Sequence, residues 1–199
     1  MAKIAVIGSG LIGRAWAISF ARAGNDVSLY DQGAGAAEKA VAFAREMAAP
    51  LEAEDLLGGQ SADEVVARIR PAGSLRDALD GAVHVQENTP EDLATKRKVF
   101  AELDAIATPE TVLASSTSAI LPSQFTRDLT GRARCLVMHP INPPYLIPAV
   151  EIVPAPWTDP AAMEKTRQLA VASGQAPIMM KREIDGFVMN RLQGALLEE

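Results

Sequence analysis

The chain has 199 residues, of which 48% are hydrophobic and 22% are charged, and its formal net charge is −6 at pH 7. This length and composition are typical of one globular domain with a real core, and the acidic balance argues against nucleic acid or an anionic membrane as a partner. Cys135 is the only cysteine, which excludes an intramolecular disulfide and favours a reducing cytoplasm.

Short apolar runs alternate with amphipathic segments along the chain. The pattern predicts strands at 4–7, 26–31, 81–87, 111–116, 134–139, 150–153 and 177–180, and helices at 11–23, 34–47, 90–107 and 161–173. We expect Pro50 to stop the second helix and Ser61 to cap a further one. Strands that alternate with helices predict an α/β fold, a Rossmann-like, doubly wound and mostly parallel sheet.

The C-terminal segment differs from the rest. An apolar helix begins near Gly186 and reaches Glu199 with no glycine or proline to stop it. We therefore expect residues 1–184 to form the Rossmann-like domain, and residues 185–199 to be the first helix of a truncated helical domain. No apolar stretch has the length of a membrane span, so a membrane partner is not expected.

The first predicted strand leads into a glycine-rich turn, G-x-G-x-x-G, that opens a helix. Its members are Gly8, Ser9, Gly10, Leu11, Ile12 and Gly13. In a dinucleotide-binding unit these glycines permit a tight turn, close approach of a pyrophosphate and close helix packing, although such a turn also occurs for packing alone. Asp31 follows Gly13 by 18 residues, where a carboxylate binds ribose hydroxyls and repels a 2′-phosphate. The combined pattern predicts NAD rather than NADP.

Two histidines are candidates for a general base. His84 lies within an apolar run and is better explained as a structural histidine, whereas His139 ends a predicted strand. Catalytic groups of open α/β sheets gather at such strand ends, and Glu151 follows 12 residues later. An imidazole with a carboxylate on its second nitrogen suits removal of a hydroxyl proton. The alternative is a strand-end histidine that only supports a loop. With so few histidines and cysteines, we expect no metal site.

Ordered motifs over nearly all of the chain resemble the N-terminal NAD-binding domain of the 3-hydroxyacyl-CoA dehydrogenase family. They are the glycine turn, Asp31, Glu91 with Lys96, residues 115–118, His139-Pro140-Ile141-Asn142-Pro143, Glu151 and residues 185–192. The resemblance implies that His139 and Glu151 form a catalytic pair. It also implies that Ser118 and Asn190 hydrogen-bond the reacting oxygen.

The resemblance gives two further residues a role in cofactor binding. Glu91 and Lys96 match positions that contact the nicotinamide half of NAD. Without the resemblance, Glu91 would be interpreted as an acid at a helix start and Lys96 as a solvated lysine.

Details of the motifs favour one branch of the family. Residues 14–17 and the Pro143-Pro144-Tyr145 step resemble the lambda-crystallin or L-gulonate 3-dehydrogenase branch, and carnitine dehydrogenase is similar too. Ser116 replaces an asparagine that is common in the acyl-CoA enzymes. The resemblance implies an NAD-dependent oxidation of a small 3-hydroxy acid, with a homodimer for the full-length protein and weak turnover by this chain alone. The alternatives are a 3-hydroxyacyl-CoA dehydrogenase and a non-catalytic, crystallin-like NAD-binding protein.

Overall fold

The computed structural model describes residues 1–198, which form an eight-stranded sheet in the order β3-β2-β1-β4-β5-β6-β7-β8. The strands are β1 (Lys3–Ile7), β2 (Asp26–Tyr30), β3 (Ile69–Pro71), β4 (His84–Glu87), β5 (Val112–Ser115), β6 (Cys135–Pro140), β7 (Ala149–Pro154) and β8 (Ala176–Met179). The first six strands are parallel, whereas β7 is antiparallel to β6 and β8 is parallel to β7. The order 3-2-1-4-5-6 is that of a doubly wound dinucleotide-binding fold, so the predicted fold class is confirmed.

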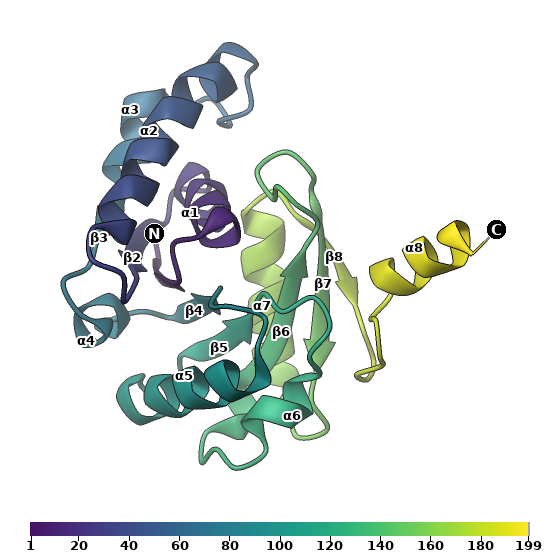
Figure 1. Ribbon diagram of the computed structural model, residues 1–199. Helices are drawn as coiled ribbons and strands as arrows, with labels where there is room; N and C mark the ends of the chain where they lie inside the picture. The colour runs from purple at the N-terminus through teal and green to yellow at the C-terminus, as the bar shows by residue number, and fades with distance from the viewer. Residues whose placement is uncertain (199) are drawn as a thin grey trace.

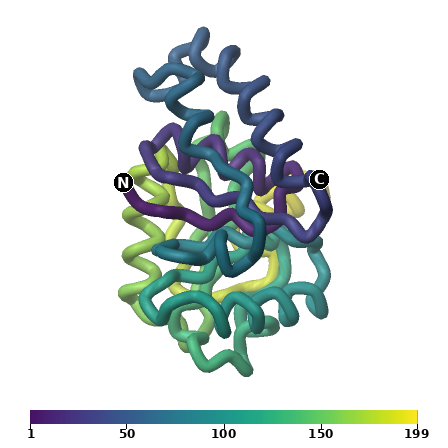
Figure 2. Tube along the Cα trace, turned by 90° about the vertical axis from the view of Figure 1, so that its left-hand side faces the viewer, coloured from purple at the N-terminus to yellow at the C-terminus, as the bar shows by residue number. Residues whose placement is uncertain are grey.

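Helices cover both faces of the sheet (Figure 1). One face carries α1 (Leu11–Arg22), α2 (Ala36–Ala53), α3 (Ala62–Ala67) and α7 (Pro160–Ala172), and the other carries α4 (Leu75–Leu79), α5 (Leu93–Ile106) and α6 (Pro122–Thr126). A 3-10 turn at Arg132–Arg134 precedes β6. Figure 2 shows α2 and α3 extending beyond the body of the sheet. The last helix, α8 (Met189–Leu197), points away from the sheet and has no buried residue (Figure 1).

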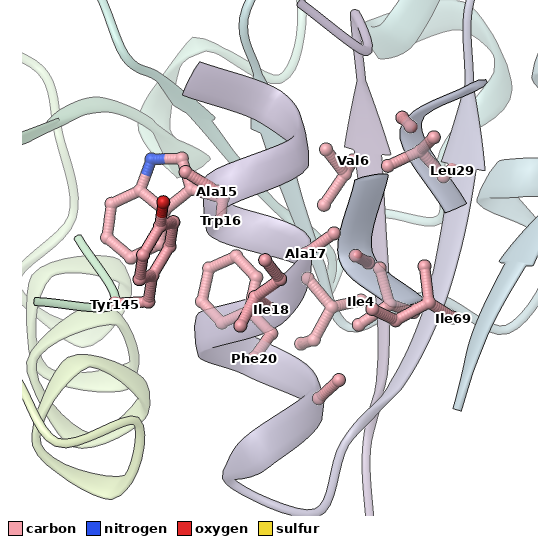
Figure 3. Close-up of a cluster of buried hydrophobic side chains, with 14 of the residues drawn as sticks. Ile4, Val6, Ala15, Trp16, Ala17, Ile18, Phe20, Leu29, Ile69 and Tyr145 are labelled. Carbon is pink, nitrogen blue, oxygen red and sulfur yellow. The ribbon is translucent and has the colours of Figure 1, made fainter. Parts of the chain in front are cut away.

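The core follows the two-residue period of the strands. In β1, Ile4 and Val6 pack against α1, while Ala5 and Ile7 pack against the opposite layer. Trp16 stacks on Phe20, with ring centroids 4.9 Å apart, and Figure 3 shows both side chains on the side of α1 where Tyr145 lies. Since both faces are covered, most strands are apolar runs, which is why seven of the eight strands could be located in the sequence.

Three predicted helix ends were wrong. α8 begins at Met189 rather than near Gly186, because Gly186 and Phe187 have positive φ values that a helix does not contain. α2 continues through Pro50 to Ala53, because the buried Leu51 anchors its last turn against the core. α5 begins at Leu93 rather than at Pro90, because the Asp92 carboxylate caps the helix by accepting the N–H of Thr95 at 2.7 Å.

The short elements β3, α4 and α6 were not predicted. With three to five residues each, they are too short to show a period. The cap predicted at Ser61 is confirmed, since Ser61 and Glu64 form a reciprocal capping box at the start of α3.

Candidate active site

The candidate site lies at one edge of the sheet. Parallel strands end at the same edge, so the residues that follow β1, β2, β4, β5 and β6 gather there. Because β7 runs in the opposite direction, it begins at this edge rather than ending there. The glycine turn, Asp31, Ser118, His139 and Glu151 all belong to this edge.

The glycine turn between β1 and α1 leaves space for a ligand. Gly8 has a φ of +87°, and a Cβ there would lie 2.8 Å from the carbonyl oxygen of Asn88. A Cβ on Gly13 would lie 1.8 Å from the carbonyl oxygen of Gly8. A Cβ on Gly10 would meet nothing within 4 Å. Gly8 and Gly13 are thus required by the packing of the turn, whereas Gly10 borders the open space that a pyrophosphate needs.

Asp31 follows β2 and faces the glycine turn. Its Oδ2 accepts the N–H of Ser9 at 2.7 Å and the hydroxyl of Ser9 at 2.9 Å, and its Oδ1 accepts the N–H of Gly33 at 2.8 Å. Burial acts to raise the pKa of Asp31, but these hydrogen bonds outweigh it and lower the pKa. A carboxylate has about four acceptor positions, so the partly exposed Asp31 keeps room for a ribose hydroxyl.

His139 and Glu151 face each other across the antiparallel pair β6 and β7. They are directly opposite in the register and point to the same face of the sheet as Val137 and Val153. The imidazole Nδ1 lies 2.7 Å from Oε2 of Glu151, and both side chains are buried. Nδ1 therefore carries the proton of this hydrogen bond, and Nε2 is the nitrogen that remains for a substrate.

Glu151 is held as a carboxylate. Its Oε1 accepts the N–H groups of Val188 at 2.6 Å and Met189 at 2.9 Å. Burial acts to raise the pKa of Glu151, but the hydrogen bonds from His139 and from these two amides lower it overall. A charged Glu151 is the form that stabilises an imidazolium.

Ser118 and Asn190 are brought together by a hydrogen bond between helix α8 and the loop after β5. Ser118 is exposed in the loop after β5, and its carbonyl oxygen accepts the side-chain N–H of Asn190 at 2.7 Å. Glu91 holds the same loop from the other side, because its Oε1 accepts the N–H groups of Ser118 at 2.9 Å and Ala119 at 3.1 Å. The three residues thus form one connected group.

Lys96 lies inside the protein and is not a solvated lysine. Its Nζ is 3.1 Å from both carboxylate oxygens of Glu87 and 3.9 Å from Oε2 of Glu91, and its side chain is 1% exposed. The N–H of Thr89 and the hydroxyl of Ser115 also donate to Glu87, at 2.6 Å each. Sequence reasoning missed Glu87, although a glutamate at the end of an apolar strand was a signal of the same kind as His139.

The Ser116 side chain links the loop after β5 to α1 and to the end of β4. Its hydroxyl accepts the side-chain N–H groups of Gln86 at 2.7 Å and Trp16 at 3.1 Å, and it donates to Oδ1 of Asn88 at 2.7 Å. All three bonds that a hydroxyl can make are used. The hydroxyl of Ser116 is therefore fully occupied within the protein.

The remaining histidine and the cysteine are structural. His84 is 2% exposed, its Nε2 lies 3.1 Å from Gln86, and burial lowers its pKa to about 4. Burial, with a further contribution from Asp104, raises the pKa of Cys135 to about 12, which leaves it an unreactive thiol. The interpretation of His84 as a structural histidine is confirmed.

Residues 1–198 contain no group of three His, Cys, Asp or Glu side chains that could hold a metal ion. None of the helices described is long and apolar enough to cross a membrane.

Two known proteins are similar in sequence to nearly the whole chain. Lambda-crystallin from Oryctolagus cuniculus is 44% identical over 200 residues, which cover 98% of this chain and 62% of that protein. L-carnitine dehydrogenase from Pseudomonas putida is 37% identical over 196 residues, which cover 98% of this chain and 60% of that protein. The chain thus spans about three fifths of the length of these relatives.

Solved structures agree with the fold. A diketoreductase superposes with a TM-score of 0.93 at 29% identity, covering 100% of this chain and 70% of that one. A 3-hydroxybutyryl-CoA dehydrogenase from Escherichia coli gives a TM-score of 0.90 at 27% identity, with 99% and 43% covered. The model of the 3-hydroxyacyl-CoA dehydrogenase NAD binding domain matches residues 3–184. The chain belongs to this family, and NAD is its cofactor.

Proposed function

We propose that the protein is an NAD-dependent dehydrogenase that oxidises the hydroxyl group of a small 3-hydroxy acid. The observation that carries this proposal is the pair of His139 and Glu151, 2.7 Å apart and buried at the edge of the sheet where the glycine turn lies. A buried imidazole oriented by a carboxylate is the arrangement that a proton-abstracting site requires.

Each residue of the site has its own role in the proposed reaction. Nε2 of His139 removes the proton of the substrate hydroxyl, and Glu151 on Nδ1 stabilises the imidazolium that forms. Ser118 and Asn190, which a hydrogen bond holds together, hydrogen-bond the reacting oxygen. NAD, when bound, accepts the hydride. The glycine turn holds its pyrophosphate and Asp31 its adenine-side ribose, while the exposed Glu91 borders its nicotinamide half and the buried Lys96 supports Glu91 from inside the protein.

Similarity to known proteins supports the substrate class that we propose. Lambda-crystallin and L-carnitine dehydrogenase share 44% and 37% identity with this chain, so we infer a small hydroxy acid such as L-gulonate or L-carnitine. Ser116 stands where the resemblance expects an asparagine in the acyl-CoA enzymes, and its hydroxyl is held by Gln86 and Asn88. This difference favours a small hydroxy acid over an acyl-CoA. The similar fold of a 3-hydroxybutyryl-CoA dehydrogenase keeps a 3-hydroxyacyl-CoA as the second candidate.

The first experiment compares substrates. We expect the full-length protein to form NADH with L-gulonate or L-carnitine faster than with 3-hydroxybutyryl-CoA, measured by NADH absorbance. A preference for 3-hydroxybutyryl-CoA would replace the small hydroxy acid by the second candidate. No NADH with any of these substrates, together with tight NAD binding, would favour the non-catalytic alternative.

The second experiment tests the base. In the full-length protein, His139→Gln is expected to lower kcat by about 10²- to 10⁴-fold while NADH binding is retained, because proton removal is lost and the cofactor site is not. His84→Gln is the matched control, since His84 is structural. Unchanged turnover by His139→Gln would remove the histidine from the mechanism.

The organisation of the whole protein is part of the proposal. We infer that residues 185–199 begin a helical domain that closes over the substrate and carries a homodimer contact, as the resemblance implies. The 199-residue chain is then expected to bind NADH with little turnover of its own.

A further inference from the structure

The two oxygens of the Glu151 carboxylate bind different groups: one the imidazole of His139, the other two backbone amides. One oxygen bonds the imidazole of His139 at 2.7 Å, and the other accepts the N–H groups of Val188 at 2.6 Å and Met189 at 2.9 Å. The carboxylate is fully buried, so no water competes for these positions. Three donors that converge from two sides fix the rotation of the carboxylate and therefore the direction in which it meets the imidazole.

The two amides point at Glu151 because the backbone before them is left-handed. Gly186 has a φ of +73° and Phe187 a φ of +48°. The N–H of Phe187 closes a turn on the carbonyl oxygen of Ile184 at 3.1 Å, after which Val188 and Met189 turn back toward the sheet. A positive φ is unfavourable for a phenylalanine, and it is retained only where the surroundings determine the conformation.

Phe187 also contacts the catalytic pair through its side chain. The ring is fully buried, and its centroid lies 5.8 Å from that of the His139 imidazole. Helix α8, which follows, has no buried residue, and the N–H of Met189 in its first turn donates to Glu151. Besides the two amides, the side chain of Asn190 donates to the carbonyl oxygen of Ser118.

We propose that the turn formed by residues 186–189 positions the catalytic pair: its amides hold Glu151 on Nδ1 of His139, and Phe187 fixes the face of the imidazole. Gly186 and Phe187 are thus positioning residues, and the inference rests on the proposed function. The inference also means that a change in the orientation of α8 changes the geometry of His139 and Glu151, and the reverse. The glycine turn follows β1, which lies four positions from β7 in the sheet, so we expect NAD binding to be retained when the turn of residues 186–189 is changed.

The test uses the fact that the chain has only two histidines. With ¹⁵N-labelled histidine, NMR reports the Nδ1 nitrogen of His139 and its bonded proton, while the resonances of the buried His84 serve as the internal reference for folding. Gly186→Val removes the left-handed turn, because a β-branched residue does not adopt this φ. Gly186→Asn is the conservative variant, because asparagine tolerates it. Gly59→Val is the matched control, with a φ of +80° at the end of the molecule formed by α2 and α3 and no atom within 4 Å of its Cβ.

We expect Gly186→Val to shift or broaden the Nδ1 resonance of His139 while leaving that of His84 in place. Gly186→Asn and Gly59→Val should retain the wild-type spectrum. In the full-length protein, Gly186→Val should lower kcat by about 10- to 100-fold with the KM for NAD unchanged, because misplacement of a catalytic group reduces the rate without affecting cofactor binding.

An unchanged His139 resonance in folded Gly186→Val overturns the proposal, whatever the turnover. If Gly186→Val loses the His84 reference signal and so does not fold, the milder Gly186→Ala is interpreted in the same way. The result is separate from the proposed function: full turnover by His139→Gln would contradict the reaction but would leave the spectra of the Gly186 variants to decide the positioning role.

Discussion

Single residues of the site owe their chemistry to their hydrogen-bond partners. Glu151 is buried, yet it accepts three hydrogen bonds that lower its pKa, and Asp31 is lowered in the same way by Ser9 and Gly33. In both cases burial alone would have favoured the neutral acid. The sequence places these carboxylates at strand ends, but it does not contain the donors that keep them charged.

Replacing Glu151 tests the first of these carboxylates. Glu151→Gln keeps the shape but removes the charge that stabilises the imidazolium, so kcat of the full-length protein should fall by about 10²- to 10⁴-fold, with the KM for NAD little changed. Glu164→Gln on the exposed surface of α7 is the matched control. A kcat within about twofold of wild type in Glu151→Gln would show that the pair does not act as a unit.

Replacing Asp31 tests cofactor choice. Asp31→Asn should weaken NADH binding by about tenfold, since a charge-assisted hydrogen bond to ribose is lost, and should narrow the preference for NADH over NADPH. Fluorescence titration with both cofactors measures this. Asp26→Asn, at the exposed start of the same strand, should bind NADH normally. NADPH binding as tight as NADH binding in the wild type would contradict the predicted preference.

At the scale of elements, different glycines of the turn between β1 and α1 serve packing and cofactor binding. Gly13 allows α1 to approach the strand, because any side chain there would collide with the carbonyl oxygen of Gly8, whereas Gly10 faces open space. Similar glycines in one motif therefore have different roles, which the pattern G-x-G-x-x-G alone does not show.

The two positions predict opposite results for alanine. Gly13→Ala should lower the free energy of unfolding by about 1–3 kcal/mol, because the turn must open to admit a Cβ. Gly10→Ala should leave the Tm close to wild type but weaken NADH binding, because its methyl group enters the pyrophosphate space. Thermal unfolding and fluorescence titration separate the two effects. A Gly13→Ala protein with the wild-type Tm would contradict the assignment.

The stability of the whole molecule depends on pH through His84. Its pKa is lowered by burial from 6.5 to about 4, so between these values the unfolded chain binds a proton that the folded protein does not. The folded state therefore loses stability as pH falls through this window, by up to about 3 kcal/mol. Above pH 6.5 the contribution of His84 is constant.

Replacing His84 removes this part of the pH dependence. Between about pH 7 and pH 4.5, wild type should lose about 2 kcal/mol more unfolding free energy than His84→Gln, measured by urea denaturation at both values. The comparison cancels the acid titration of the carboxylates, since both proteins share them. Equal losses in the two proteins would show that His84 is protonated in the folded state.

The sequence by itself determined the fold class, the NAD-binding family and the position of the principal side chains along the chain. Buried parallel strands are continuous apolar runs, and strand ends are marked by Gly8, Asp31 and His139, so local patterns were sufficient. The ends of α2 and α5 were not determined, because the anchoring of Leu51 and the cap at Asp92 depend on how the chain is packed.

Only the tertiary structure decided how the site residues meet. The antiparallel direction of β7 places Glu151 opposite His139, and its second oxygen meets amides 37 and 38 residues further along the chain. The same holds for Lys96, whose buried partner Glu87 was not recognised. The physical reason is that hydrogen bonds and ion pairs between distant segments depend on register and burial, which short-range patterns of hydrophobicity and turn residues do not encode.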